Sequence, residues 1–223
     1  MIHSCVRRGR VTPGQQRALD VLWPHYGVET DKLLDLNALF GRVAEKHLEI
    51  GFGNGDALVT MAKAHPENDY LGIDMYRPGV GHLLLQLKAA ELCNVRVMCA
   101  DAVEILQHHL PAHSLDSVYL FFPDPWPKKR HQKRRLLQAE FVKLLGQRIK
   151  FGGYLHLATD WKAYAEQMLE VLEDAPFFVN CVAKGAFAPR PPERPLTKFE
   201  QRGLRLGHGV WDLLYQCREV SQN

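Results

Sequence analysis

The feature that most constrains the fold is an alternation, from about Lys46 onward, of short apolar runs with longer segments of helical period. Seven of the runs have the length and composition of strands. They are His47–Ile50, Tyr70–Asp74, Val95–Ala100, Leu115–Phe122, Gly153–Thr159, Phe177–Val182 and Val210–Cys217. Strands that alternate with helices predict an α/β fold, here a doubly wound, mainly parallel sheet of seven strands with helices on both faces.

Two segments lie outside this alternation. Residues 1–35 have weak periodicity and several arginines, so we expect a basic N-terminal arm that leads into a helix. Residues 36–223 are long enough for one domain with a single core. Within them, residues 185–209 form a long loop with prolines and arginines, which makes this loop a candidate lid or binding segment.

Charge is distributed unevenly, although the net charge is only +3. Besides the arginines of the arm, a second basic cluster contains Lys128, Lys129, Arg130, His131, Lys133, Arg134 and Arg135. Such local basicity predicts a polyanionic partner.

Cysteine usage and hydropathy indicate the compartment. The five cysteines are scattered and include no C-x-x-C pair, so we expect neither a disulfide framework nor a metal site. No apolar run has the length of a signal-peptide core or of a membrane span, so we expect a cytoplasmic protein that does not enter membranes.

The segment Leu48–Gly55 places closely spaced glycines directly after a predicted strand and before a predicted helix, Asp56–Ala64. Glycines let a backbone turn sharply and approach a ligand closely, although a tight turn without a ligand is the alternative. The spacing departs from the dinucleotide fingerprint G-x-G-x-x-G because Asp56 stands where the third glycine belongs. Glu49, just before the loop, would repel a pyrophosphate but not an aminoacyl sulfonium group. The loop therefore favours S-adenosylmethionine, with Gly51 and Gly53 as contacts.

Two further acids, Asp74 and Asp101, stand at the end of the second predicted strand and after the third. Asp74 is placed to accept hydrogen bonds from ribose hydroxyls, and Asp101 to meet the adenine amino group. Each acid alone has a plainer interpretation as a helix N-cap or loop residue. Because ligands of open α/β sheets bind beyond the carboxyl ends of the strands, the series beginning with Glu49 predicts a cofactor site.

After the fourth predicted strand, three prolines occupy positions 123, 125 and 127. Prolines fix backbone dihedrals, which would hold Asp124 rigidly at the mouth of a site. The alternative is a stiff surface turn followed by a solvated charge run.

Several long motifs carry a family resemblance. They are Val6-Arg7-Arg8, Gly14 to Leu19, Leu48 to Gly55, Gly72-Ile73-Asp74, Pro78 to Gly81, Pro123 to Lys128, Ala158-Thr159-Asp160 and Arg194 to Gly203. Over nearly its whole length the chain resembles the bacterial tRNA (guanine-46-N7)-methyltransferases, which implies a Rossmann-like methyltransferase domain that uses S-adenosylmethionine. Asn54 and Asp74 depart from the Met and Glu of many members.

The resemblance also implies roles for individual residues. Cofactor contacts fall on Glu49, Asp74, Asp101 and Asp124, and Asp124 is also the proposed catalytic residue. Substrate contacts fall on Lys128, Asp160, Thr197, Lys198, Phe199 and Glu200. RNA contacts fall on Arg130, His131, Gln132, Lys133, Arg134 and Arg135. The implied product is a tRNA methylated on N7 of guanine 46 in the variable loop, and the enzyme is expected to be a monomer or a homodimer.

The chemistry fits these residue types. N7 of guanine carries an in-plane lone pair, so Asp124 need not act as a base; it can instead hold the N1–H and 2-amino edge and aim N7 at the methyl group. We expect the base to be pulled from its stack, with Trp126 and Phe122 either stacking on it or belonging to the core.

Three other functions are compatible with parts of the sequence. A methyltransferase for an exocyclic amine shares the proline-bounded carboxylate but needs a Pro-Pro pair. A non-catalytic RNA-binding subunit would not need intact acids and glycines at every cofactor position. A nicotinamide-dependent oxidoreductase is disfavoured by Glu49 and by the glycine spacing.

Overall fold

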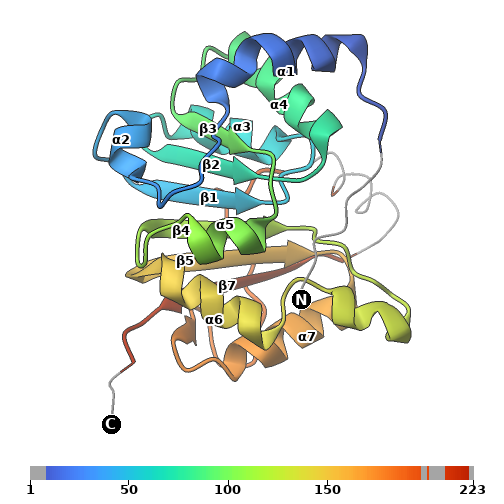
Figure 1. The fold of residues 1–223 in the computed structure, drawn as a ribbon. Coiled ribbons are helices and arrows are strands. Elements are labelled where there is room, and N and C mark those ends of the chain that lie inside the picture. The colour runs from blue at the N-terminus through green and yellow to red at the C-terminus, as the bar shows by residue number, and fades with distance from the viewer. Residues whose placement is uncertain (1–8, 197–199, 201–208, 221–223) are drawn as a thin grey trace. The chain divides into compact units, whose positions relative to one another are not determined.

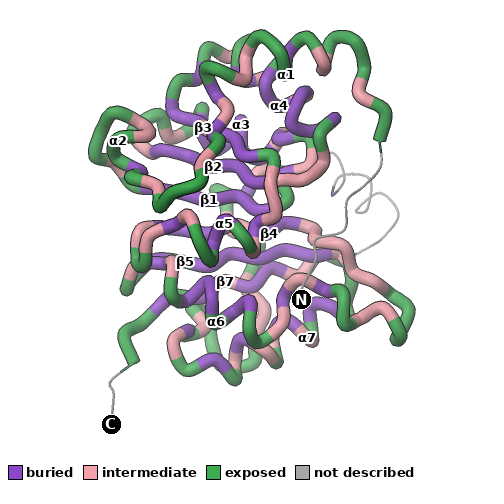
Figure 2. Tube along the Cα trace, in the orientation of Figure 1, coloured by how far each residue is buried: buried purple, intermediate pink, exposed green. Residues whose placement is uncertain are grey.

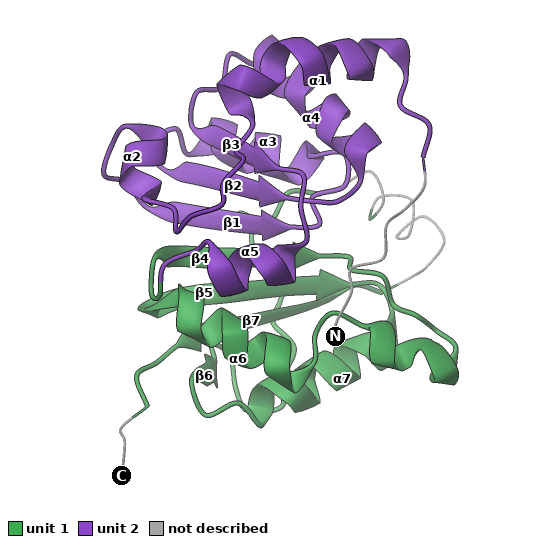
Figure 3. Ribbon diagram, in the orientation of Figure 1, with its two compact units in different colours: residues 1–2, 112–223 green, residues 3–111 purple. Residues whose placement is uncertain are grey.

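The computed structural model describes residues 9–196, 200 and 209–220. Their contacts divide the chain into two compact units, residues 3–111 and residues 112–223 with residues 1–2 (Figure 3). Each unit is considered by itself. This division does not coincide with the predicted boundary at residue 35, and the basic arm stays a prediction, since residues 1–8 lie outside the described residues.

The first unit contains three parallel strands in the order β3-β2-β1. They are β1 (Lys46–Ile50), β2 (Asp69–Ile73) and β3 (Val95–Met98), with Leu48 paired to Leu71 and Tyr70 to Val95. Every residue of β1 and β2 is buried (Figure 2). Because successive side chains point to opposite faces, this pattern means that both faces are covered, as in parallel sheets generally.

The helices of this unit begin where local sequence signals place them. They are α1 (Pro13–Tyr26), α2 (Leu36–Phe40), α3 (Asp56–Ala64), α4 (Arg77–Ala89) and α5 (Ala102–His108) (Figure 1). Thr12 and Gln15 form a reciprocal capping box at the start of α1, with Pro13 at the first helical position. Helix α1 packs on α4, where Gly81 leaves room for the backbone of Gln15.

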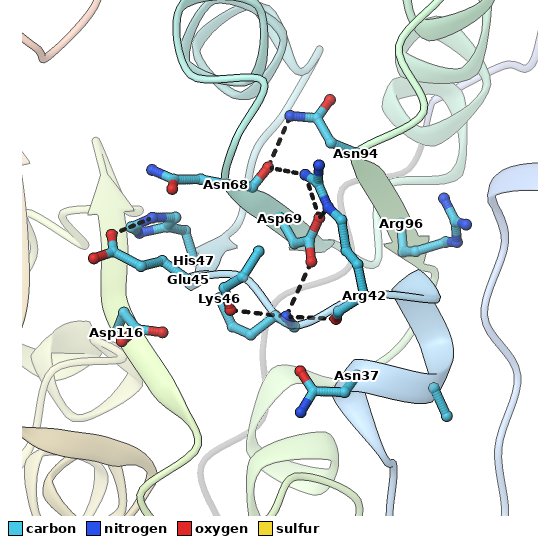
Figure 4. Close-up of polar contacts among 12 residues, drawn as sticks. Asn37, Arg42, Glu45, Lys46, His47, Asn68, Asp69, Asn94, Arg96 and Asp116 are labelled. Carbon is cyan, nitrogen blue, oxygen red and sulfur yellow. Dashed lines mark hydrogen bonds and ion pairs between the residues drawn. The ribbon is translucent and has the colours of Figure 1, made fainter.

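The amino ends of β1 and β2 carry a buried ion cluster around Asp69 (Figure 4). The Asp69 side chain is fully buried, with Lys46 Nζ 3.0 Å from Oδ2 and Arg42 Nη2 2.7 Å from Oδ1. Nearby, the Asn94 amide donates to the carbonyls of Ala62 and Asn68, which joins the segments around it. This end of the strands is therefore closed by charges that belong to the chain itself.

The second unit contains four strands in the order β4-β5-β7-β6. They are β4 (Leu115–Phe121), β5 (Ile149–Thr159), β6 (Phe178–Asn180) and β7 (Trp211–Cys217). Strands β4 and β5 are parallel, and β7 is antiparallel to both β5 and β6. A 3₁₀ helix, η1 (Lys129–Arg134), precedes α6 (Ala139–Arg148), and α7 (Lys162–Glu173) follows β5. Helices α6 and α7 both contact β5 (Figure 1).

All seven predicted strands are present, and the predicted helix at 56–64 has the observed bounds. The largest difference is the start of β5, which begins at Ile149, four residues before the predicted Gly153. The strand continues through an irregularity, since Leu115 pairs with Ile149 but Ser117 pairs with Tyr154. Gly152 has a φ of 85° there, a conformation that glycine adopts without strain. A bulge thus replaces the predicted strand start.

Candidate functional site

The glycine loop after β1 has one open and one closed side. Gly51, Gly53 and Gly55 have φ values of 72°, 59° and 82°, which a side chain would strain. Among the described residues, a Cβ built on Gly51 or Gly53 would meet nothing within 4 Å, whereas one on Gly79 would fall 1.9 Å from the Gly53 carbonyl oxygen. Helix α4 therefore closes one side of the loop, and no described residue fills the space next to the backbone on the other side.

Asp74, just beyond β2, fixes the geometry of this loop. Its Oδ2 accepts a hydrogen bond from the Gly53 amide at 2.8 Å, and its Oδ1 accepts one from the Tyr76 amide at 2.7 Å. Each carboxylate oxygen has two lone pairs, so this arrangement is compatible with further hydrogen bonds from ribose hydroxyls. The acid predicted for the ribose thus also holds the loop.

Asp101, beyond β3, is the N-cap of α5, and its Oδ1 accepts from the Val103 amide at 2.8 Å. The plainer interpretation of this acid is therefore correct. Its contact with adenine stays a prediction.

Glu49 on β1 is a buried acid that lacks a hydrogen-bond partner at one of its oxygens among the described residues. Its side chain is buried at 3% exposure, and Oε2 has no hydrogen-bond partner among the described residues. Burial, and secondarily the charge of Asp74, raise the pKa of Glu49 to about 8. A buried acceptor without a donor calls for a ligand. The ammonium group of S-adenosylmethionine supplies both donors and opposite charge, so the residues of this loop fit that cofactor.

The second unit brings Asp124 and Asp160 to one sheet edge. Asp160 directly follows β5 and Asp124 follows β4 by three residues, while Phe121 of β4 pairs with Ala158 of β5. Since the two strands are parallel neighbours, both acids lie beyond the same carboxyl edge.

Backbone strain flanks Asp124. Phe122 has a φ of 51° and Trp126 a φ of 42°. Bulky residues seldom adopt such values, which cost about 1–3 kcal/mol each and are concentrated at functional sites. The rigid turn predicted from the prolines therefore also has strained residues at both of its ends.

The basic run is a mostly exposed surface segment as far as Arg134. Lys128 precedes η1, and Lys128, Lys129, Arg130, Lys133 and Arg134 are all exposed. The Arg134 guanidinium lies 5.2 Å from the Trp126 ring centroid, and the His131 ring stands edge-on to that indole at 5.9 Å. Trp126 thus organises the basic run in this structure, while its stacking on a target base stays a prediction.

Arg135 differs from its neighbours, because its side chain points inward and is only 2% exposed. Its Nε donates to the Pro125 carbonyl at 2.8 Å. The exposure that the predicted RNA contact at this position requires is absent from the structure.

A buried charge cluster bonds Arg194 and Glu200 of the long loop to Asp212 of the sheet. Arg194 Nη1 and Nη2 each donate to Glu200 at 2.6 Å, and Nη2 also donates to Asp212 of β7 at 3.1 Å. His156 Nε2 of β5 lies 2.8 Å from Asp212 Oδ1. The Arg194 guanidinium also lies 5.7 Å from the Phe122 ring centroid, directly after β4.

This cluster bears on two predictions. Glu200, predicted to contact substrate, is buried with both oxygens bonded to Arg194. Arg194 also bonds Asp212, and Asp212 in turn contacts His156. Neither His156 nor Asp212 was predicted as a site residue, because nothing local in the sequence links them. Thr197, Lys198 and Phe199 lie outside the described residues.

The described residues contain no group of three His, Cys, Asp or Glu side chains arranged to hold a metal ion. They also contain no helix long and apolar enough to cross a membrane.

Comparison with known proteins places this geometry among methyltransferases. A family model described as "Putative methyltransferase" matches residues 44–213. The tRNA (guanine-N(7)-)-methyltransferase of Halorhodospira halophila is 58% identical over 214 residues, 95% of this chain and 93% of that protein. The protein of the same name from Alkalilimnicola ehrlichii is 58% identical over 222 residues, 98% of this chain and 93% of that protein.

Solved structures share the fold at low identity. The 16S rRNA methyltransferase KamB aligns with a TM-score of 0.61 at 14% identity, covering 87% of this chain and 98% of that chain. A SAM-dependent O-methyltransferase from Thermotoga maritima aligns with a TM-score of 0.54 at 13% identity, covering 97% of this chain and 69% of that chain. The predicted Rossmann-like α/β fold is confirmed.

Proposed function

Because this chain belongs to the tRNA (guanine-N(7)-)-methyltransferase family, we propose that it methylates guanine 46, in the variable loop of tRNA. The chain is an S-adenosylmethionine-dependent methyltransferase, and N7 of a guanine in tRNA is its acceptor. The observation that carries the proposed acceptor site is the strained, proline-rich turn at 122–127, which presents Asp124 at a carboxyl edge of the sheet.

On the cofactor side, the chain supplies fixed acceptors. When bound, S-adenosylmethionine supplies a methyl group on a positively charged sulfur. Glu49 would accept from its ammonium group, since its Oε2 has no hydrogen-bond partner among the described residues. The backbone at Gly51 and Gly53 would leave room for the aminoacyl part, Asp74 would accept from the ribose, and Asp101 would accept from the adenine amino group.

On the acceptor side, the chain orients a base that is already nucleophilic. Asp124 accepts hydrogen bonds from N1–H and the 2-amino group of guanine, which leaves N7 on the opposite edge free to attack. The same carboxylate favours the positive charge that develops on the purine as its N7 becomes methylated. Asp160 lies beyond the same sheet edge and shares in holding the base.

The exposed cations from Lys128 to Arg134 contact phosphates. Such contacts contribute affinity and register, and little sequence information. The target base leaves its stack to reach Asp124. We propose a cytoplasmic enzyme that works as a monomer or a homodimer.

The test uses unmodified tRNA and radiolabelled S-adenosylmethionine, followed by borohydride and aniline treatment, which cleaves at N7-methylguanine. We expect one cut, at guanine 46. A tRNA with adenine at that position and the Asp124→Ala variant are the controls, and both should give no cut. A cut elsewhere would refute the assignment to position 46, and label without cleavage would mean that the acceptor is another atom.

A further inference from the structure

Arg135 ends the basic run, yet its surroundings resemble those of a core residue. It is 2% exposed, whereas Lys133 and Arg134 before it are exposed. Its guanidinium donates through Nε to the Pro125 carbonyl at 2.8 Å and through Nη1 to Oε1 of Gln167. These two partners therefore come from segments far apart in the sequence.

The contacts continue into the first turns of α7. Nη1 also lies 3.4 Å from the Ala163 carbonyl oxygen, and the guanidinium lies 4.8 Å from the Tyr164 ring centroid. The Tyr164 hydroxyl accepts from the Leu137 amide at 3.1 Å, and the Gln167 amide donates to the Leu137 carbonyl at 3.2 Å. Arg135 is thus the centre of a network that joins the proline turn, the segment after η1 and α7.

Stability alone does not account for a cation at this place. Among the described residues, no carboxylate forms an ion pair with Arg135, and its Nη2 has no hydrogen-bond partner. Burial lowers the pKa of the guanidinium. An apolar side chain of similar volume would avoid these costs, but it could not bond two carbonyls and an amide with one rigid planar group.

We propose that Arg135 is a positioning residue, which holds Asp124 and Asp160 in register by bonding the carbonyl next to Asp124 to the first turns of α7. Pro125 directly follows Asp124, and α7 begins two residues after Asp160. Arg135 is therefore not one of the phosphate-binding cations. The inference rests on the proposed function, because it concerns how the guanine is held, and a misplacement of about 1 Å can cost on the order of 100-fold in rate.

The experiment compares Arg135→Met with Lys133→Met in the full chain. We measure kcat and KM for tRNA, and the dependence of tRNA affinity on salt with S-adenosylhomocysteine bound. Rates are divided by the number of cofactor sites counted by calorimetry, so that unfolded protein does not count. For Arg135→Met we expect kcat to fall about 10- to 100-fold with an unchanged salt slope. For Lys133→Met we expect a salt slope smaller by about one and a higher KM for tRNA, with a smaller change in kcat than in Arg135→Met.

Two further variants keep the test decisive if Arg135→Met does not fold. Gln167→Leu removes one acceptor of the guanidinium and the donor to the Leu137 carbonyl at a half-buried helix position, and we expect a loss of about 3- to 10-fold in kcat with the salt slope unchanged. Arg135→Lys keeps the charge but not the planar fork, and we expect it to recover less than half of the lost rate.

The outcomes separate the two proposals. If Arg135→Met reduces the salt slope as Lys133→Met does and keeps its kcat, Arg135 is a phosphate contact and the inference is overturned. Full activity of Gln167→Leu, or full rescue by Arg135→Lys, overturns it as well. If the unaltered enzyme fails to methylate guanine 46, the proposed function fails instead.

Discussion

Two buried carboxylates in residues 3–111 lie near opposite ends of the parallel strands, and they are surrounded in opposite ways. Asp69, at the start of β2, faces Lys46 and Arg42 at 3.0 and 2.7 Å. Glu49, one residue before the end of β1, has an oxygen without a partner among the described residues and an acid, Asp74, as its charged neighbour. The chain neutralises the first carboxylate by itself and leaves the second to a ligand.

The same difference recurs in residues 112–223. Arg194 is bonded to Glu200 and Asp212, so this buried cation is paired within the chain. Arg135 is equally buried, but among the described residues it bonds only neutral groups, and its Nη2 has no hydrogen-bond partner. Paired buried charges therefore belong to the stability of the fold, and unpaired ones belong to the site. Substitution of each charge should therefore change either the stability of the fold or the binding and catalysis at the site, and not both.

The largest effect is expected for Arg194→Met. Removal of this guanidinium leaves the buried carboxylates of Glu200 and Asp212 without their cation, so we expect the free energy of unfolding to fall by about 3–5 kcal/mol, measured by urea denaturation. Arg190→Met is the matched control. The Arg190 side chain is 41% exposed and its Nε lies 3.8 Å from Glu200, so we expect a loss below about 1 kcal/mol. Equal losses in the two variants would contradict the distinction.

Next in size is Asp69→Asn, which leaves the buried Lys46 ammonium without its ion pair. We expect a loss of about 3 kcal/mol in the free energy of unfolding, with the cofactor Kd of the folded protein unchanged. Glu67→Gln, which removes an exposed carboxylate 3.1 Å from His65, should leave the free energy of unfolding unchanged within the error of the measurement, because solvent screens this pair. A weaker cofactor Kd in Asp69→Asn would show that this cluster also serves the site.

For Glu49→Gln we expect weaker cofactor binding without a loss of stability, the opposite of Asp69→Asn. A neutral amide cannot pair with the cofactor's ammonium group, so we expect a loss of about 1.5–3 kcal/mol in binding, roughly 10- to 100-fold in Kd by calorimetry. The free energy of unfolding should not fall, since the variant no longer buries an ionisable acid without a partner. Glu45→Gln, at an exposed position just before β1, should leave the Kd unchanged. A large loss of stability in Glu49→Gln would show that Glu49, like Asp69, stabilises the fold.

The smallest effect is a pH dependence of the cofactor-free protein. The pKa of Glu49 is about 8 in the fold, against an ordinary 4.5, so the unfolded chain releases this proton at lower pH than the folded one. The acid therefore contributes most stability below pH 4.5, and that contribution is lost as the pH rises towards 8. Between pH 6.5 and 7.5, the stability of Glu49→Gln relative to the unaltered protein should rise by up to about 1.4 kcal/mol. A constant difference in urea denaturation would refute the shift.

Local patterns were sufficient for much of the fold. The seven strands, the helix at 56–64 and the three glycines after β1 depend on side-chain period, on turn chemistry and on φ angles that few residues adopt. These signals extend over a few neighbouring residues. Gly153 was misinterpreted as a strand start for the same reason, because a bulge and a turn differ only in what the partner strand does.

What the sequence determined by itself is therefore the order of the elements and the residues that stand where strands end, including Glu49, Asp74 and Asp124. The tertiary structure alone decided which charges are paired. Arg135 and Gln167 are 32 residues apart, and His156 and Asp212 are 56 apart. The physical reason is that the free energy of a buried charge depends on solvent exclusion and on partners brought by packing, and neither is present in a local segment of chain.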